Sequence, residues 1–223
     1  MEQNKYESHV LQLLHNIKHK IPQPYAGSKI PVWHNGVQAA TLRALTTEDL
    51  QNAPLIRLLA KWREENSDAY LSRSPITLEG TKKWLDKGVL ENKDRLLFLL
   101  EDSAGSPIGH MGFYRFNFNE MRCEADNIVR GEKVLPGIMT PALVALMRWG
   151  MGVLQVQGYT LHTFADNSRA ISLYERCGFS QISKAPLKKE ESAGKSEWVF
   201  LPQAEKGERY WLKMQYSPQK VQK

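Results

Sequence analysis

Apolar residues recur along the chain in two kinds of pattern, one with the period of a helix and one typical of strands. Helical spacing predicts helices over residues 6–20, 46–62, 77–90, 140–158 and 167–177. Apolar or alternating runs predict strands over 30–33, 37–45, 95–100, 108–114, 124–130, 159–164, 196–201 and 209–216, with another starting at Phe179. Because helices and strands alternate, we predict a mixed α/β sheet with helices packed against it.

Five local signals define the ends of these elements. Asn35-Gly36 is typical of a type I′ hairpin turn, because both residues tolerate a positive φ angle. Thr46 and Asn167 are predicted to cap the helices that follow them. Thr140-Pro141 combines a hydroxyl cap with a proline at the first helical position. Gly178 suits the left-handed residue that ends a helix.

Length and composition favour one ordinary globular domain. The chain has 223 residues, of which 42% are hydrophobic and 24% charged. It contains no apolar run near the roughly 20 residues that span a bilayer, and its first residues do not resemble a signal peptide. With only Cys123 and Cys177, neither a disulfide framework nor a metal-ligand spacing is present. We therefore expect a cytoplasmic protein without a metal or a membrane partner.

The net charge indicates an anionic ligand. Thirty Lys and Arg residues against 24 Asp and Glu residues give +6 and a pI near 9.2. A basic surface attracts nucleic acid, acidic membranes or phosphorylated small molecules. No basic stripe with interleaved aromatic residues is found, so we expect no nucleic-acid partner and favour small phosphorylated ligands.

One loop has the features of a phosphate site. Residues 131–139 lie between a predicted strand and the helix predicted from Thr140, and they include Gly131 and Gly137. Free N–H groups and the helix dipole attract anions at such a position. The loop lacks the Gly-Lys-Thr of a Walker motif and the Gly-x-Gly-x-x-Gly of a dinucleotide site. A plain strand-to-helix turn explains it equally well when it is taken alone.

The segment from Asn167 to Phe179 carries a tyrosine on an apolar helical face. Ala170, Leu173 and Tyr174 share that face. From spacing alone, a tyrosine in this position is a core residue.

Taken together, these segments resemble the GNAT superfamily of acyl-CoA-dependent N-acyltransferases. The resemblance covers about residues 41–216 and is most specific over 124–179, where Asn167 to Phe179 is similar to the family stretch Asn-x-x-Ala-x-x-x-Tyr-x-x-x-Gly-Phe. It implies a mixed, mostly antiparallel central sheet flanked by helices. Residues 1–40 would add an N-terminal helix and a hairpin, and residues 217–223 would form a basic tail.

The resemblance also implies where acetyl-CoA, or another acyl-CoA, binds as co-substrate. Backbone amides of the 131–139 loop would hold its pyrophosphate. Of the family's loop pattern only Gly137 matches, because Val134 and Met139 stand at the other positions, so the assignment is regional. The residues implied in this site are Ile128, Val129, Arg130, Leu135, Pro136, Gly137, Ile138, Met139, Thr140, Asn167 and Arg169.

The implied reaction is direct attack of an amine on the thioester in a ternary complex. Tyr174 would give a proton to the leaving thiolate, and N–H groups near residues 128–130 would bind the carbonyl oxygen. Glu124, Asp126 and His110 are candidates for the base that takes the amine proton, although for each taken alone surface solvation or a structural hydrogen bond is the better interpretation.

Three short segments indicate an acceptor. Residues 108–111, 128–131 and 136–139 are similar to enzymes that acylate nucleotide-linked amino sugars for bacterial surface polysaccharides such as lipopolysaccharide O-antigen, with dTDP-3-amino-3,6-dideoxyhexoses as one substrate group. Candidate acceptor-binding residues are Tyr70, Arg73, Phe113, Tyr114 and Arg115. A protein N-terminal or lysine acetyltransferase and a non-catalytic acyl-CoA sensor remain alternatives. A homodimer is left open as the assembly state.

Overall fold

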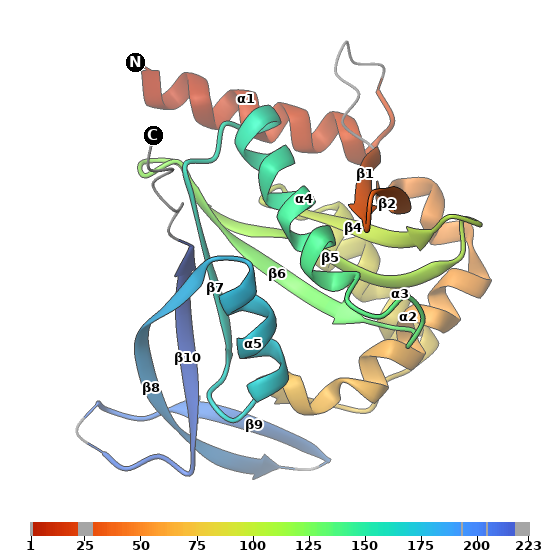
Figure 1. Ribbon diagram of the computed structural model, residues 1–223. Helices are drawn as coiled ribbons and strands as arrows, with labels where there is room; N and C mark the ends of the chain where they lie inside the picture. The colour runs from red at the N-terminus through yellow and green to blue at the C-terminus, as the bar shows by residue number, and fades with distance from the viewer. Residues whose placement is uncertain (1, 22–28, 193, 204, 217–223) are drawn as a thin grey trace.

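The structure, a computed structural model, describes residues 2–21, 29–192, 194–203 and 205–216. The basic tail predicted at 217–223 lies outside the described residues. Within the described part, one sheet of ten strands runs in the order β1-β2-β4-β5-β6-β7-β10-β8-β9-β3 (Figure 1). The strands are β1 (Lys29–His34), β2 (Val37–Ala44), β3 (Ser72–Arg73), β4 (Arg95–Asp102), β5 (Pro107–Asn117), β6 (Arg122–Arg130), β7 (Gly158–Phe164), β8 (Phe179–Ser192), β9 (Lys195–Phe200) and β10 (Arg209–Tyr216).

Helices cover both faces of this sheet, and the mixed fold class predicted from the sequence is confirmed. The α-helices are α1 (Glu2–Lys18), α2 (Ala53–Glu65), α3 (Leu78–Lys83), α4 (Met139–Val153) and α5 (Ser168–Arg176). Two 3₁₀ segments are η1 (Thr47–Gln51) and η2 (Ser67–Ala69), and η3 (Trp84–Leu90) is a π-helix. No helix among the described residues is both long and apolar enough to cross a bilayer.

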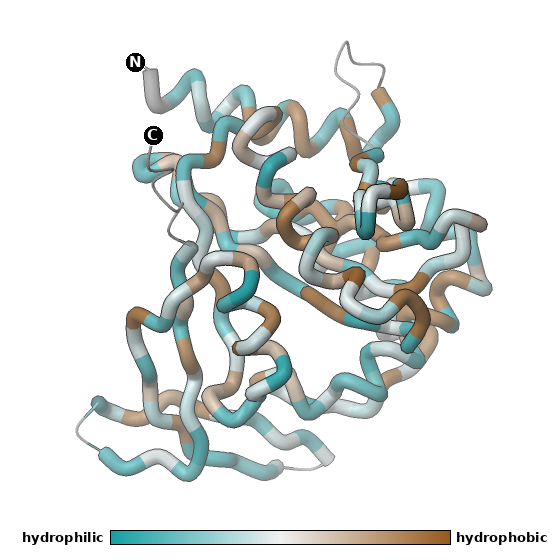
Figure 2. The backbone as a smooth tube through the Cα atoms, viewed as in Figure 1, coloured by the Kyte–Doolittle hydropathy of each residue, from teal (hydrophilic) through white to brown (hydrophobic). Residues whose placement is uncertain are grey.

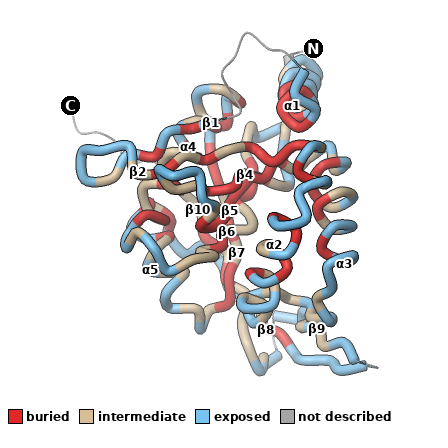
Figure 3. The backbone as a smooth tube through the Cα atoms, turned by 90° about the vertical axis from the view of Figure 1, so that its right-hand side faces the viewer, coloured by how far each residue is buried: buried red, intermediate tan, exposed pale blue. Residues whose placement is uncertain are grey.

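Two hydrophobic clusters hold the layers together. The larger one packs α1, α4 and α5 on one face of the sheet, and the smaller one packs α2 and η3 on the other. The buried residues concentrate in the central strands (Figure 3). The β8–β9 hairpin is more hydrophilic than these central strands (Figure 2), and most of its residues are exposed.

Three of the local signals are confirmed. Asn35 and Gly36 adopt φ angles of 51° and 81°, as a type I′ turn requires. The Oδ1 atom of Asn167 accepts a hydrogen bond from the N–H of Ala170 at 3.1 Å and caps α5. Gly178 has a φ angle of 92°, which only glycine adopts without strain.

The helices predicted from Thr46 and from Thr140 have different limits in the structure. The helix expected from Thr46 is interrupted after η1, because Asn52 accepts from the N–H of Leu55 at 3.0 Å and starts α2 as a new helix. Thr140 is not a cap: α4 begins at Met139 without a side-chain cap. Gly158 does not close this helix either, since α4 ends at Val153 and Gly158 is the first residue of β7.

The β8–β9 hairpin lies at the end of the sheet opposite to β1, where β3 is the edge strand. The N–H of Trp198 donates to the carbonyl of Leu71 at 2.7 Å, and β9 pairs with the two residues of β3, a strand that the sequence pattern did not predict. Arg209 of β10 adds a second link to this region, because its Nη1 donates to the carbonyl of Asp68 at 3.2 Å while its Nε and Nη2 donate to the Asp166 carboxylate at 2.8 Å. The hairpin therefore joins the segment after α2 to the C-terminal half of the sheet.

Substitutions at two glycines of α4 test how tightly this helix packs against the sheet. A Cβ atom at Gly150 would lie 2.4 Å from Tyr159 Oη and 2.9 Å from Phe113 Cζ, whereas a Cβ at Gly152 would meet no atom within 4 Å. We expect Gly150→Ala to lower the free energy of unfolding by about 1–3 kcal/mol through overpacking. Gly152→Ala, the matched control on the same helix, should raise it by up to about 1 kcal/mol. Urea denaturation measures both, and equal effects would contradict this packing.

Candidate active site

A cavity opens where two parallel strands separate. Strands β6 and β7 pair over only three residues each, 122–124 with 158–160, although both strands continue further. Beyond Glu124 the edge of β6 that faces β7 therefore lacks a strand partner. A cavity of about 860 Å³ begins there and extends along α5 to the segment between α2 and β3. Its size suits a small molecule or cofactor.

A β-bulge shapes the wall of this cavity. Between β5 and β6, the step from His110 to Gly112 is opposed by the longer step from Val129 to Asp126, so β6 carries one extra residue. Asn127 has a φ angle of 51° at this point. Its carbonyl accepts a 2.8 Å hydrogen bond from Nδ1 of His110, which stabilises the bulge.

His110 does not line the cavity. It is fully buried near Trp62 and Trp84, with ring centroids 6.0 and 6.4 Å away, and it is not among the lining residues. Burial lowers the pKa of His110 to about 4, so the imidazole is neutral near pH 7. The structure does not place His110 where a general base must lie.

Phe113 is also absent from the cavity, contrary to its expected place in the acceptor site. Strand alternation turns Phe113 toward α4, where its ring stacks on Trp149 and Tyr159 in the core. The other four predicted acceptor residues, Tyr70, Arg73, Tyr114 and Arg115, line the cavity.

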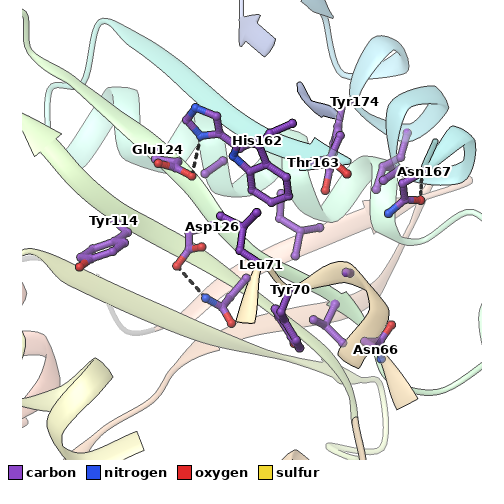
Figure 4. A pocket seen from close by; sticks show the side chains of 18 of the residues that line it. Asn66, Tyr70, Leu71, Tyr114, Glu124, Asp126, His162, Thr163, Asn167 and Tyr174 are labelled. Carbon is purple, nitrogen blue, oxygen red and sulfur yellow. Dashed lines mark hydrogen bonds and ion pairs between the residues drawn. The ribbon is translucent and has the colours of Figure 1, made fainter. Parts of the chain in front are cut away.

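Glu124 and Asp126 line the cavity side by side on β6 (Figure 4). Glu124 Oε1 accepts from His162 Nδ1 at 2.9 Å and Oε2 accepts from Arg115 at 3.1 Å. Burial raises the pKa of this carboxyl, but the hydrogen bonds and charges of His162 and Arg115 outweigh burial, so the pKa falls below its ordinary value. Glu124 is therefore ionised at neutral pH.

His162 also lines the cavity, although the sequence pattern did not single it out. Its strand, β7, runs parallel to β6 with Glu124 opposite Thr160, so the next residue on that face is His162. The signal was a histidine within the strand predicted over 159–164. To recognise His162 as a neighbour of Glu124 requires the register between β6 and β7, two strands that are apart in the sequence.

The floor of the cavity contains polar atoms without partners. Arg95 pairs with Asp126, whose carboxylate also accepts from Asn127 Nδ2 at 2.7 Å. Among the described residues, however, the buried Arg95 Nε and Tyr70 hydroxyl have no hydrogen-bond partner. Two donors therefore stand next to the cavity without an acceptor.

Helix α5 contributes Tyr174, Asn167 and Arg169 to the opposite wall. Tyr174 is 7% exposed, and burial, followed by the charge of Asp126, raises the pKa of its hydroxyl above the ordinary value. The hydroxyl is therefore protonated across the physiological range and can donate.

The predicted phosphate loop meets the cavity in part. Gly137, Ile138, Met139 and Thr140 line it, whereas Leu135 and Pro136 do not. Ile128, Val129 and Arg130 line the cavity from β6. No side chain caps α4, but the N–H of Thr140 donates to the Gly137 carbonyl at 3.3 Å and Pro141 has no N–H, so the N–H of Met139 is the group of the first turn that is left for an anion.

The charge of the lining is strongly positive. Its two carboxylates, Glu124 and Asp126, are both paired with arginines. The lining contains eight cationic side chains: Arg63, Arg73, Arg95, Arg115, Arg130, Arg169, Arg176 and Lys213. Within the described part of the chain, no group of three or more His, Cys, Asp or Glu side chains could hold a metal ion.

Sequence comparisons found a matching family and a similar enzyme. A family profile described as Acetyltransferase (GNAT) domain matches residues 40–180, more than half of the chain. A spermidine N(1)-acetyltransferase of Vibrio cholerae is 24% identical over 143 residues, which cover 62% of this chain and 78% of that one.

Solved structures share the fold at lower identity. A spermidine N-acetyltransferase from Vibrio cholerae, crystallised with CoA and spermine, superposes with a TM-score of 0.60 at 20% identity, covering 80% of this chain and 95% of that one. A probable GNAT acetyltransferase from Chromobacterium violaceum gives 0.61 at 13% identity, covering 86% and 87%.

Proposed function

Because the chain belongs to the GNAT family of acetyltransferases, we propose that it acylates the amine of an anionic, oxygen-rich acceptor, namely a nucleotide-linked amino sugar. The family makes the chain an acyl-CoA-dependent N-acyltransferase with acetyl-CoA as co-substrate. The family does not identify the acceptor, which depends on the residues that line the cavity.

The excess of cationic side chains in the cavity is the observation that carries this proposal. Eight Arg and Lys residues face two carboxylates, and both carboxylates are already in ion pairs. A polyamine needs unpaired acidic groups, and this lining would repel it. The phosphates of a nucleotide-linked sugar, together with those of CoA, would instead find several arginines. We therefore do not transfer the polyamine substrate of the Vibrio cholerae relative to this chain.

The unpartnered donors in the cavity floor support the same class of acceptor. Tyr70 Oη and Arg95 Nε need oxygen atoms to accept their hydrogens. Sugar hydroxyls and phosphates supply such oxygens, whereas the ammonium groups of a polyamine are donors. Tyr114, Phe200 and Trp211 add aromatic surface to the lining, on which a nucleotide base can stack.

In the proposed reaction, the acceptor amine attacks the thioester carbonyl directly within a ternary complex. N–H groups of residues 128–130, on the unpaired edge of β6, would bind the developing oxyanion. Tyr174 would protonate the departing thiolate, and its raised pKa keeps the required proton in place. Asn167 and Arg169 would lie along the CoA arm at the start of α5.

We extend the proposal to the pathway and compartment expected from the sequence. Acylated nucleotide sugars are precursors of bacterial surface polysaccharides, and the reaction would take place in the cytoplasm. Both cysteines, Cys123 and Cys177, are free, which agrees with a reducing compartment.

An acceptor panel tests the substrate class. With acetyl-CoA, we expect kcat/KM for a dTDP-amino sugar to exceed that for spermidine or an amino-terminal peptide by about 100-fold, because the cavity charge favours phosphates. Added salt should reduce this preference. A preference for spermidine or for peptides would contradict the proposal, and acyl-CoA binding without turnover on any amine would indicate a sensor.

Tyr174→Phe tests the proton donor. The substitution removes only the hydroxyl, so we expect kcat to fall by roughly 100-fold, the typical contribution of a general acid. Coenzyme A affinity, measured by calorimetry, should change little. Full turnover of the variant, with single-turnover kinetics showing that chemistry limits the rate, would exclude this role.

A further inference from the structure

His162 lies in the cavity wall beside Glu124, across the cavity from Tyr174 (Figure 4). We propose that His162 is the general base of the reaction and that Glu124 is its positioning residue. The proposal deepens the proposed function at the same site and rests on it only for the identity of the acceptor.

The hydrogen bond between the two residues fixes the histidine tautomer. Glu124 is ionised, so it can only accept, and the 2.9 Å contact therefore requires a hydrogen on Nδ1 of His162. The neutral imidazole then carries its lone pair on Nε2. That nitrogen has no hydrogen-bond partner among the described residues, and the side chain, 20% exposed, opens to the cavity.

Packing fixes the orientation of the ring. The imidazole is parallel to the indole of Trp211 within 3°, with ring centroids 6.2 Å apart. Glu124 is held in turn by Arg115 at 3.1 Å and is 8% exposed, so it cannot turn easily toward a substrate. A base that is oriented by a buried carboxylate is a recurring arrangement in acyl transfer.

The other candidate bases are occupied or distant. Both oxygens of Glu124 already accept hydrogen bonds from His162 and Arg115. Asp126 is engaged by Arg95 and Asn127. His162 is thus the group with an uncommitted basic lone pair among the proposed candidates that line the cavity.

Charged groups of both signs surround the imidazole. Glu124 and, two residues further along β6, Asp126 lie on one side, with Arg115 of β5 behind Glu124. Lys213 of β10 stands directly opposite His162 in the β7–β10 ladder and also lines the cavity. An ammonium acceptor would enter beside this group of charges.

The proton balance of the step is complete. Nε2 of His162 takes one proton from the ammonium form of the acceptor, which frees the nitrogen lone pair for attack. The N–C bond forms, the C–S bond breaks, and the thiolate takes the proton of Tyr174. The second amine proton, released as the tetrahedral adduct collapses, restores the tyrosine, and the imidazolium returns its proton to solvent.

Nitrogen-15 NMR of the histidine side chains tests the orientation without any acceptor. In the wild-type protein at pH 8, we expect the His162 signals of the neutral Nδ1–H tautomer. In Glu124→Gln the share of the Nε2–H tautomer should rise, because the carboxylate no longer selects Nδ1–H. An Nε2–H tautomer in the wild-type protein would overturn the proposal.

Kinetics test the base itself, using the amine of the panel that reacts fastest. We expect His162→Gln to lower kcat by about 100-fold without weakening coenzyme A binding, and to remove the acidic limb of the pH profile of kcat/KM. His9→Gln, at an exposed position on α1, is the matched control and should retain both the rate and the limb. If His162→Gln kept the acidic limb, His162 would not be the general base. If the limb were lost but the wild-type protein did not react with nucleotide sugars, only the proposed acceptor would be refuted.

Discussion

The separation of β6 from β7 is the constraint on which the rest of this structure depends. Two parallel strands that are hydrogen-bonded over three residues and then diverge leave an unpaired backbone edge in the middle of a sheet. Such an edge is unfavourable in a protein core unless a ligand or water meets it. The extra residue at Asn127 and the buried His110 that binds its carbonyl stabilise β6 along this edge. The same separation gives α5 access to the cavity, which brings Tyr174 opposite the strand that carries Glu124.

Around this opening, the lining residues carry an excess of positive charge. The carboxylates that reach the cavity are neutralised within the protein, by Arg95 at Asp126 and by Arg115 at Glu124. What remains for a ligand is a set of cations and two donors that lack acceptors. A shared GNAT fold with polyamine acetyltransferases is compatible with a different acceptor, because specificity arises from such side chains and not from the fold.

Several features that depend on local chemistry were predictable from the sequence, although the local signals at Thr140 and Gly158 were wrong. The cap at Asn167, the left-handed Gly178 and the Asn35-Gly36 turn each depend on one or two adjacent residues, and each is confirmed. Features that depend on pairing between distant strands were not. The prediction for Phe113 failed because its orientation depends on the face of β5 that packs on α4. His162 was missed because only the parallel register between β6 and β7 shows that it lies beside Glu124.

A crystal structure of the protein with coenzyme A tests the central claim most directly, because that claim is the position of the acyl carrier. We predict that the pantetheine arm fills the opening between β6 and β7, with its amides bonded to the unpaired edge of β6, its pyrophosphate at residues 137–140, and its sulfur within hydrogen-bond reach of the Tyr174 hydroxyl. Coenzyme A bound elsewhere, with β6 and β7 separated by protein or solvent alone, would contradict the account.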